Sequence, residues 1–220
     1  MTDLSAITAS GLSRRAFLGA GLGTGILLLP GCVSMLSTPT PVLYTLDPSG
    51  SKPVASLPTF SPPLALALAV GLPDAPQSLD TARIALQPRP RTLDYFANSA
   101  WSDPAPVLVQ RLMVATLERS RSLAIVGRED AAYRADRLLS LNLIDFEARY
   151  VDGESRPPVV SVHLDATLIA LPDRRALGQY SVRREVAATR NDIPTVVAAF
   201  QTAANAATTD LAAWTLSRLK

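Results

Sequence analysis

The sequence predicts an α+β domain: a largely antiparallel mixed sheet with two long helices packed on it. Apolar and polar residues alternate along residues 137–150, 160–170 and 176–187, which is typical of a three-stranded meander with one wet face. Apolar residues recur at helical spacing along residues 103–122 and 192–214. The 189 residues that follow residue 31 suffice for one domain with a sizeable core.

The first half of the chain contributes shorter strands. Residues 42–46 are β-rich and end at an Asp-Pro turn signal. Residues 64–70 alternate leucine with alanine, so both faces are apolar and a central, covered strand is expected. Residues 81–86 and 92–96 flank a Pro-Arg-Pro turn, which predicts a hairpin. Residues 123–127 form a further short strand after the first helix.

Boundaries of the longer elements are marked by local signals. Asp103 and Asp192 each stand just before a helix that opens with proline, so both are predicted N-caps. The apolar face of the strand over residues 137–150 changes sides at Leu143 and Ile144. Because one extra residue reverses the alternation, a β-bulge is expected there.

The N-terminal stretch has the features of an export signal. Arg14 and Arg15, followed by Phe17 and Leu18, resemble a twin-arginine (Tat) signal. The uncharged run over residues 16–29 is close to the length of a signal-peptide apolar region. It is shorter than the roughly 20 residues that a membrane-spanning helix needs. Residues 1–31 are therefore a predicted signal peptide.

Leu29, Gly31 and Cys32 resemble a bacterial lipobox. A thiolate is the nucleophile that accepts a diacylglycerol in a thioether, and the small Gly31 permits cleavage before Cys32. Each buried methylene contributes about 0.8 kcal/mol, so two or three acyl chains, palmitate among them, anchor a protein stably. The alternative is an uncleaved anchor helix with an incidental cysteine. Val33 replaces the aspartate that signals inner-membrane retention, so an outer-membrane destination, on its periplasmic face, is expected.

Composition excludes several classes of function. The formal charge of +2 is nearly neutral and gives no electrostatic case for nucleic-acid binding. Cys32 is the single cysteine and lipidation consumes it, so no disulfide or cysteine-based metal site is expected. His163 is the single histidine, which limits histidine-dependent metal and acid–base chemistry. No cofactor or metal is predicted, and residues 32–220 carry no glycine-rich phosphate-binding motif.

The order of motifs after the cysteine is similar to that of a known family. The segments that carry the resemblance are Leu-Tyr-Thr-Leu at 43–46, residues 79–85, Trp101 before the first helix, and residues 196–200 and 211–214. Together they resemble the ABC-type transport auxiliary lipoprotein family, which includes paraquat-inducible protein C-like lipoproteins. The resemblance implies a mixed sheet with two helices, and a division into a lipidated tether over residues 32–41 and one domain over residues 42–220.

The resemblance also implies a function and partners. Such a lipoprotein serves an ABC lipid transport system at the outer membrane, where it docks or caps a periplasmic lipid conduit, alone or as a homo-oligomeric ring. Its partner would be a mammalian-cell-entry (MCE) domain protein with its permease and ATPase, and the lipid would be a phospholipid. ATP hydrolysis would belong to that partner, and the chain itself is not expected to be an enzyme.

Two groups of residues are candidates for contacts or chemistry. Asp80 and Arg83 form either a partner-docking pair or a structural ion pair, and the structural interpretation is favoured. Tyr95 and Trp101 are either core plugs or interface anchors.

Ser161, His163 and Asp165 are the residue types of a hydrolase triad and share one strand face. Neighbours on that face are nearly 7 Å apart, roughly twice the reach of a hydrogen bond, and no Gly-x-Ser-x-Gly elbow is present. The favoured interpretation is that these three residues lie on the solvent-exposed face of a strand. An envelope hydrolase therefore remains an alternative function, as does a free-standing periplasmic lipid carrier with its ligand between sheet and helices.

Overall fold

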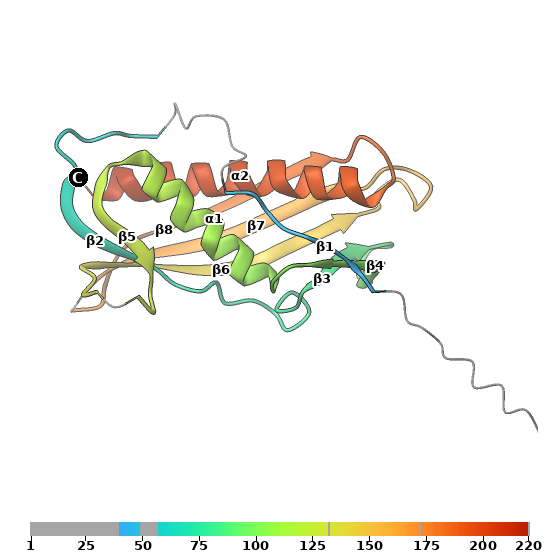
Figure 1. Cartoon of the computed structure of the whole chain (residues 1–220), viewed down its shortest axis with the longest axis horizontal. Coiled ribbons are helices and arrows are strands. Elements are labelled where there is room, and N and C mark those ends of the chain that lie inside the picture. Colours follow the sequence, from blue (N-terminus) through green and yellow to red (C-terminus); the bar gives the residue numbers. More distant parts are fainter. Residues whose placement is uncertain (1–39, 49–56, 132, 172, 220) are drawn as a thin grey trace, which may run out of the picture. The chain divides into compact units, whose positions relative to one another are not determined.

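The structure is a computed structural model that describes residues 40–48, 57–131, 133–171 and 173–219. The predicted signal peptide, with Arg14, Arg15, Phe17, Leu18 and the Gly31–Cys32 cleavage site, lies outside the described residues. The elements in chain order are β1 (Val42–Tyr44), β2 (Leu64–Val70), β3 (Arg83–Gln87), β4 (Asp94–Trp101), α1 (Ala105–Ser120), β5 (Leu123–Arg128), β6 (Arg137–Arg149), β7 (Val159–Ala170), β8 (Arg175–Ala187) and α2 (Ile193–Arg218). The predicted α+β class is confirmed (Figure 1).

The long strand β6 organises the sheet. On one edge it pairs antiparallel with β7, which pairs antiparallel with β8, so the predicted meander is confirmed. Its other edge is shared by two strands: β2 pairs with its first residues and β3 with its last. Beyond β2 lies β5, and beyond β3 lie β4 and then β1.

The prediction of a largely antiparallel sheet was wrong. Among the described residues four of the seven strand pairings are parallel: β1 with β4, β2 with β5, β2 with β6, and β3 with β6. Each joins strands that are distant in the sequence, whereas the antiparallel pairs are hairpin neighbours. Hairpin signals identify the second kind, but alternation within a strand contains no information about its direction relative to a distant partner.

The predicted bulge and one of the two predicted caps are present. The β6–β7 register shifts between Leu143 and Asp145, leaving Ile144 as the extra residue. Asp192 caps α2, because its side chain accepts a hydrogen bond from the Thr195 N–H at 3.0 Å. Asp103 does not cap α1: the N-cap is Pro104, so the carboxylate stands one residue too early. It pairs instead with Arg111 at 2.8 Å.

The core between the sheet and the helices is mostly aliphatic and has a cluster of three aromatic rings within it. Trp101 at the end of β4, Phe146 on β6 and Phe200 on α2 are each at most 1% exposed. Their ring centroids lie 5.6, 5.2 and 4.8 Å apart, in tilted and edge-on pairs. The predicted apolar stripe of α2 is buried except for Trp214, which is partly exposed, and its alanines let the helix lie close on the sheet. Figure 1 shows α2 lying along β7 and β8.

Candidate functional site

The meander presents a polar surface on its helix-free side, here called the polar face. Side chains on that side alternate with the buried ones, and the register places those of adjacent strands opposite one another. Its central members are Asp145, Glu147 and Arg149 on β6, Ser161, His163 and Asp165 on β7, and Ser181, Arg183 and Glu185 on β8. This placement confirms that Ser161, His163 and Asp165 share one face.

Arg149 holds together the charges at one end of the polar face. Its guanidinium lies 2.9 Å from the Asp145 carboxylate, 2.8 Å from that of Glu147 and 3.5 Å from that of Glu185 across the sheet. Burial alone would lower the pKa of Arg149. The hydrogen bonds and negative charges of Glu147 and Asp145 outweigh it, so its pKa is raised. The contact with Glu185 joins the charges of β6 to β8 across the sheet.

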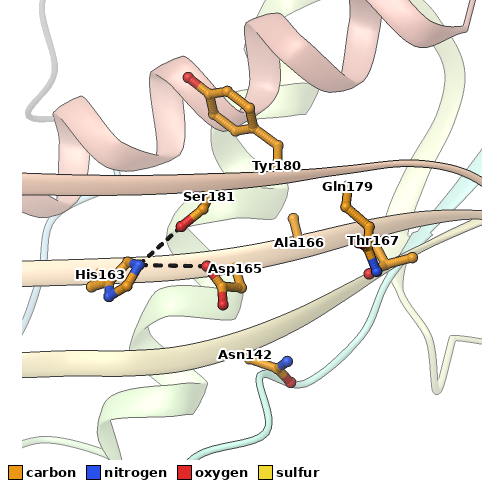
Figure 2. Close-up of a pocket in the computed structure, with 8 residues that line it drawn as sticks. All are labelled: Asn142, His163, Asp165, Ala166, Thr167, Gln179, Tyr180 and Ser181. Carbon is orange, nitrogen blue, oxygen red and sulfur yellow. Dashed lines mark hydrogen bonds and ion pairs between the residues drawn. The ribbon is translucent and has the colours of Figure 1, made fainter.

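His163 is bonded at both ring nitrogens. Nε2 lies 2.9 Å from Ser181 Oγ and 3.4 Å from a carboxylate oxygen of Asp165, contacts that Figure 2 shows as dashed lines. Nδ1 lies 3.0 Å from the guanidinium of Arg183. Because a guanidinium only donates, Nδ1 must accept, and the proton of the neutral ring is then on Nε2. His163 in this state donates to its neighbours and is not a base for Ser181.

Ser161 is not part of a triad. Its side chain is fully buried, and its Oγ has no hydrogen-bond partner within the described part of the chain. A nucleophile needs a base within about 2.6–3.2 Å and access for substrate. The sequence identified the shared face correctly but paired His163 with the wrong serine, because the nearer hydroxyl comes from β8.

A shallow groove of about 390 Å³ opens on the polar face. The residues that give it its polar character are Asn142, His163, Asp165, Thr167, Gln179 and Ser181 (Figure 2). Its hydrogen-bond donors and acceptors suit a polar partner surface. Over residues 40–48, 57–131, 133–171 and 173–219, no group of three or more histidine, cysteine, aspartate and glutamate side chains is arranged to hold a metal ion.

The four residues predicted as partner contacts divide between the surface and the core. Arg83 lies flat on Tyr95, with its guanidinium carbon 3.6 Å from the ring centroid. Asp80 is exposed, and the ion pairs of the described residues do not include one between Asp80 and Arg83. Trp101 is 1% exposed, so its side chain belongs to the core and is not an interface anchor. The Arg83–Tyr95 pair remains at the surface as a candidate partner contact.

Sequence reasoning missed two features of the surface. Ser181, Arg183 and Glu185 were not singled out, although the predicted antiparallel pairing of residues 160–170 with 176–187 would have placed them beside the residues of β7. Exposed apolar side chains at Val42, Leu43, Leu93 and Val151 were also missed. No sequence signal distinguishes them from core residues, because their exposure depends on the position of β1 at the edge of the sheet and on how the turns around Leu93 and Val151 lie against it. No described helix combines the length and the apolar character needed to cross a bilayer.

Known proteins share this architecture. The crystal structure of protein XCC0632 from Xanthomonas campestris is 26% identical in sequence, with a TM-score of 0.70 over 80% of this chain and 95% of that one. A second, uncharacterized protein of 16% identity shares the fold, with a TM-score of 0.60 over 79% of this chain and 97% of its own. No curated protein matches the chain. A family model described as the ABC-type transport auxiliary lipoprotein component matches residues 44–212, and the chain belongs to that family.

Proposed function

We propose that this protein is a non-enzymatic accessory lipoprotein of an MCE-type ABC lipid transport system, anchored to the outer membrane through Cys32. The observation that carries the proposal is the family match over residues 44–212, which runs from the end of β1 into the last turns of α2. The MCE partner, the lipid cargo and the outer-membrane location go beyond the family description. They are inferred from the lipobox-like residues and from the motif order in the sequence.

The packing of the core favours docking over carriage of a lipid. A carrier needs an apolar space for acyl chains, and the alternative function placed that space between sheet and helices. Trp101, Phe146 and Phe200 pack there with ring centroids 4.8 to 5.6 Å apart, among buried aliphatic side chains. A lipid there would have to displace these rings, at a cost of several kcal/mol for each aromatic side chain removed from the core. We therefore assign the lipid path to the partner and a docking or capping role to this chain.

The surface offers polar contacts for such docking. The polar face carries charged and amide side chains that are already positioned by strand pairing, and the Arg83–Tyr95 pair adds a planar, partly exposed contact. Arginine and tyrosine are among the residues that contribute most to protein interfaces. The hydrolase alternative is disfavoured because Ser161 is buried and because Arg183 occupies Nδ1 of His163.

A deletion strain tests the proposed function. Loss of the protein is expected to sensitise the outer membrane to detergents or to alter lipid uptake, and the wild-type gene is expected to restore both. A Cys32→Ser variant, exported in equal amount, is expected not to restore them, since it lacks the attachment point. Normal permeability and lipid uptake in a deletion strain without a redundant system would overturn the proposal.

A further inference from the structure

The strand directions bring two turns to one end of the sheet, here called the anchor end, and aim the chain before β1 toward it. β1 is parallel to β4 and pairs with its last residues, Val42 with Ser99 and Tyr44 with Trp101, so the chain that precedes Val42 runs toward the turn over residues 88–93, from which β4 emerges. Because β3 is parallel to β6, the turn that follows β3 lies at the same end as the turn over residues 150–158 that follows β6. Figure 1 shows the arrowheads of β3 and β6 on the same side.

The two turns of the anchor end are in contact. The Tyr150 N–H donates to the Gln87 carbonyl at 3.0 Å. Arg89 and Pro90 of one turn and Tyr150 and Val151 of the other line a common hollow of about 60 Å³. The turns therefore present one continuous surface.

Large apolar side chains are exposed at this end and on the strand next to it. Leu93 in the first turn is 44% exposed and Val151 in the second is 67% exposed, and Val42 and Leu43 follow on β1, opposite Ser99 and Ala100, at 57 and 63%. They make up four of the seven exposed large hydrophobic residues in the described part of the chain. Such clusters on a protein surface mark contact with a partner or a membrane.

Two arginines accompany these apolar residues. Arg89 and Arg91 are exposed, and neither forms an ion pair with another described residue. Arg91 has a φ of 64°, so the turn holds it in the left-handed region. An arginine buries its aliphatic stem beside apolar groups and directs its guanidinium at phosphate oxygens, which is the chemistry of a phospholipid headgroup layer.

The short distance in sequence between Cys32 and β1 indicates that the anchor end contacts the membrane. Val42 follows Cys32 by ten residues, and a fully extended chain spans about 3.5 Å per residue. A lipidated Cys32 therefore keeps the start of β1 within about 35 Å of the bilayer surface. Since β1 is parallel to β4, the chain that precedes Val42 runs toward the anchor end, which carries Leu93, Val151 and the two unpaired arginines.

We propose that the anchor end rests on the phospholipid bilayer that holds the lipidated Cys32. Leu93 and Val151 enter the headgroup layer, and Arg89 and Arg91 bind lipid phosphates. This contact fixes the orientation of the domain, so the rest of its surface is presented in a defined way to a periplasmic partner. The inference rests on the lipid anchor of the proposed function.

Tryptophan quenching in vesicles tests the contact. Leu93→Trp, Val151→Trp and, as the control, Ile125→Trp are prepared in the full-length lipidated protein. Ile125 is 47% exposed, lies on β5 and pairs with β2 far from the anchor end. In vesicles of phosphatidylethanolamine and phosphatidylglycerol with brominated acyl chains, the emission added at positions 93 and 151 is expected to be lost. The emission added at position 125 is expected to persist. Equal quenching at all three positions, or none at 93 and 151, would overturn the proposal.

Charge reversal tests the role of the arginines. In the L93W protein, Arg89→Glu with Arg91→Glu is expected to restore emission and shift it to longer wavelength. The matched control reverses Arg174, in the turn before β8, and Arg175, the first residue of β8, at the opposite end of the sheet. An unchanged signal in the first pair, or the same change in both pairs, would contradict phosphate binding by Arg89 and Arg91.

A further experiment distinguishes a failure of the lipid anchor at Cys32 from a failure of the contact between the anchor end and the bilayer. Mass spectrometry and vesicle flotation of the wild type and of Cys32→Ser report whether Cys32 is lipidated. If it is not, the free Cys32 thiol is coupled to a maleimide phospholipid and the tryptophan quenching is measured again. Quenching at positions 93 and 151 in that preparation supports the contact while the anchor proposal fails. Absence of quenching there overturns the contact itself.

Discussion

Trp101 meets the ring of Phe200 edge-on, at an interplanar angle of 87° and a centroid distance of 5.2 Å. The pair joins the end of β4 to α2, and Phe146 of β6 completes the cluster. Through these rings the strands around β4 and the long meander share one core.

Trp101→Ala is expected to lower the free energy of unfolding by about 3–5 kcal/mol, because it leaves a cavity among rings that cannot close around it. Ile125→Ala, on an exposed side chain of β5, is the control, with an expected change within about 0.5 kcal/mol. Guanidinium unfolding followed by circular dichroism measures both. A loss for Trp101→Ala as small as the control would show that the cluster does not join the two parts of the sheet.

Arg149→Met is expected to destabilise the domain by about 1–3 kcal/mol, because Asp145, Glu147 and Glu185 lose their shared partner. The estimate is below that for a fully buried pair because Arg149 is 21% exposed and Glu185 51% exposed. Arg156→Met is the control: its 3.9 Å pair with Asp152 is largely exposed and should contribute almost nothing. Equal urea midpoints for the two variants would contradict a structural role of the Arg149 network.

Asp192→Ala is expected to lower the thermal midpoint at pH 7 by removing the cap of α2, whereas Asp192→Asn retains an acceptor and should lose less. The hydrogen bond from the Thr195 N–H holds the pKa of Asp192 below its ordinary value of 3.8. A lowered pKa means that the charged carboxylate contributes stability above pH 3.8, which is lost as the pH falls through the folded-state pKa. The gap in midpoint between wild type and Asp192→Ala should therefore narrow as the pH falls below 3.8. A gap that is constant with pH would contradict capping by the ionised side chain.

The sequence predicted the local elements because each has a local physical signal. The meander is encoded by alternation, its bulge by the change of face at Ile144, and the start of α2 by Asp192 and Pro194. The parallel pairings were missed because they depend on which distant strands fit beside β6. Two different strands, β2 and β3, divide one edge of β6 between them, and nothing within either strand indicates this arrangement.

The candidate site was predicted only in part, because contacts between strands depend on a register that the pattern within one strand does not reveal. Strand alternation placed Ser161, His163 and Asp165 on one face, which the structure confirms. It did not reveal that Ser181 and Arg183 of β8 take both nitrogens of His163, because that depends on the register between β7 and β8. Nothing in the sequence indicated whether Trp101 lies in the core or at an interface, because its burial requires α2 to pack against the end of β4.

Ser161→Ala and His163→Ala are expected to complement a deletion strain as well as the wild type. Ser161 Oγ has no partner among the described residues, so its removal should cost little stability. His163→Ala removes bonds at the surface of a strand and is expected to reduce stability only slightly. Detergent resistance of the complemented strains, with protein levels matched, measures the effect. Loss of function in a folded, normally abundant Ser161→Ala protein would support the hydrolase alternative.

The central claim, that this lipoprotein is a subunit of a transport system, is tested most directly by its partners. The tagged full-length protein is purified from crosslinked, detergent-solubilised membranes, and everything retained is identified by mass spectrometry, with Cys32→Ser as the control. The account predicts stoichiometric recovery of an MCE-domain protein together with its permease and ATPase, reduced in the Cys32→Ser preparation. Recovery of the lipoprotein alone after crosslinking would contradict the account.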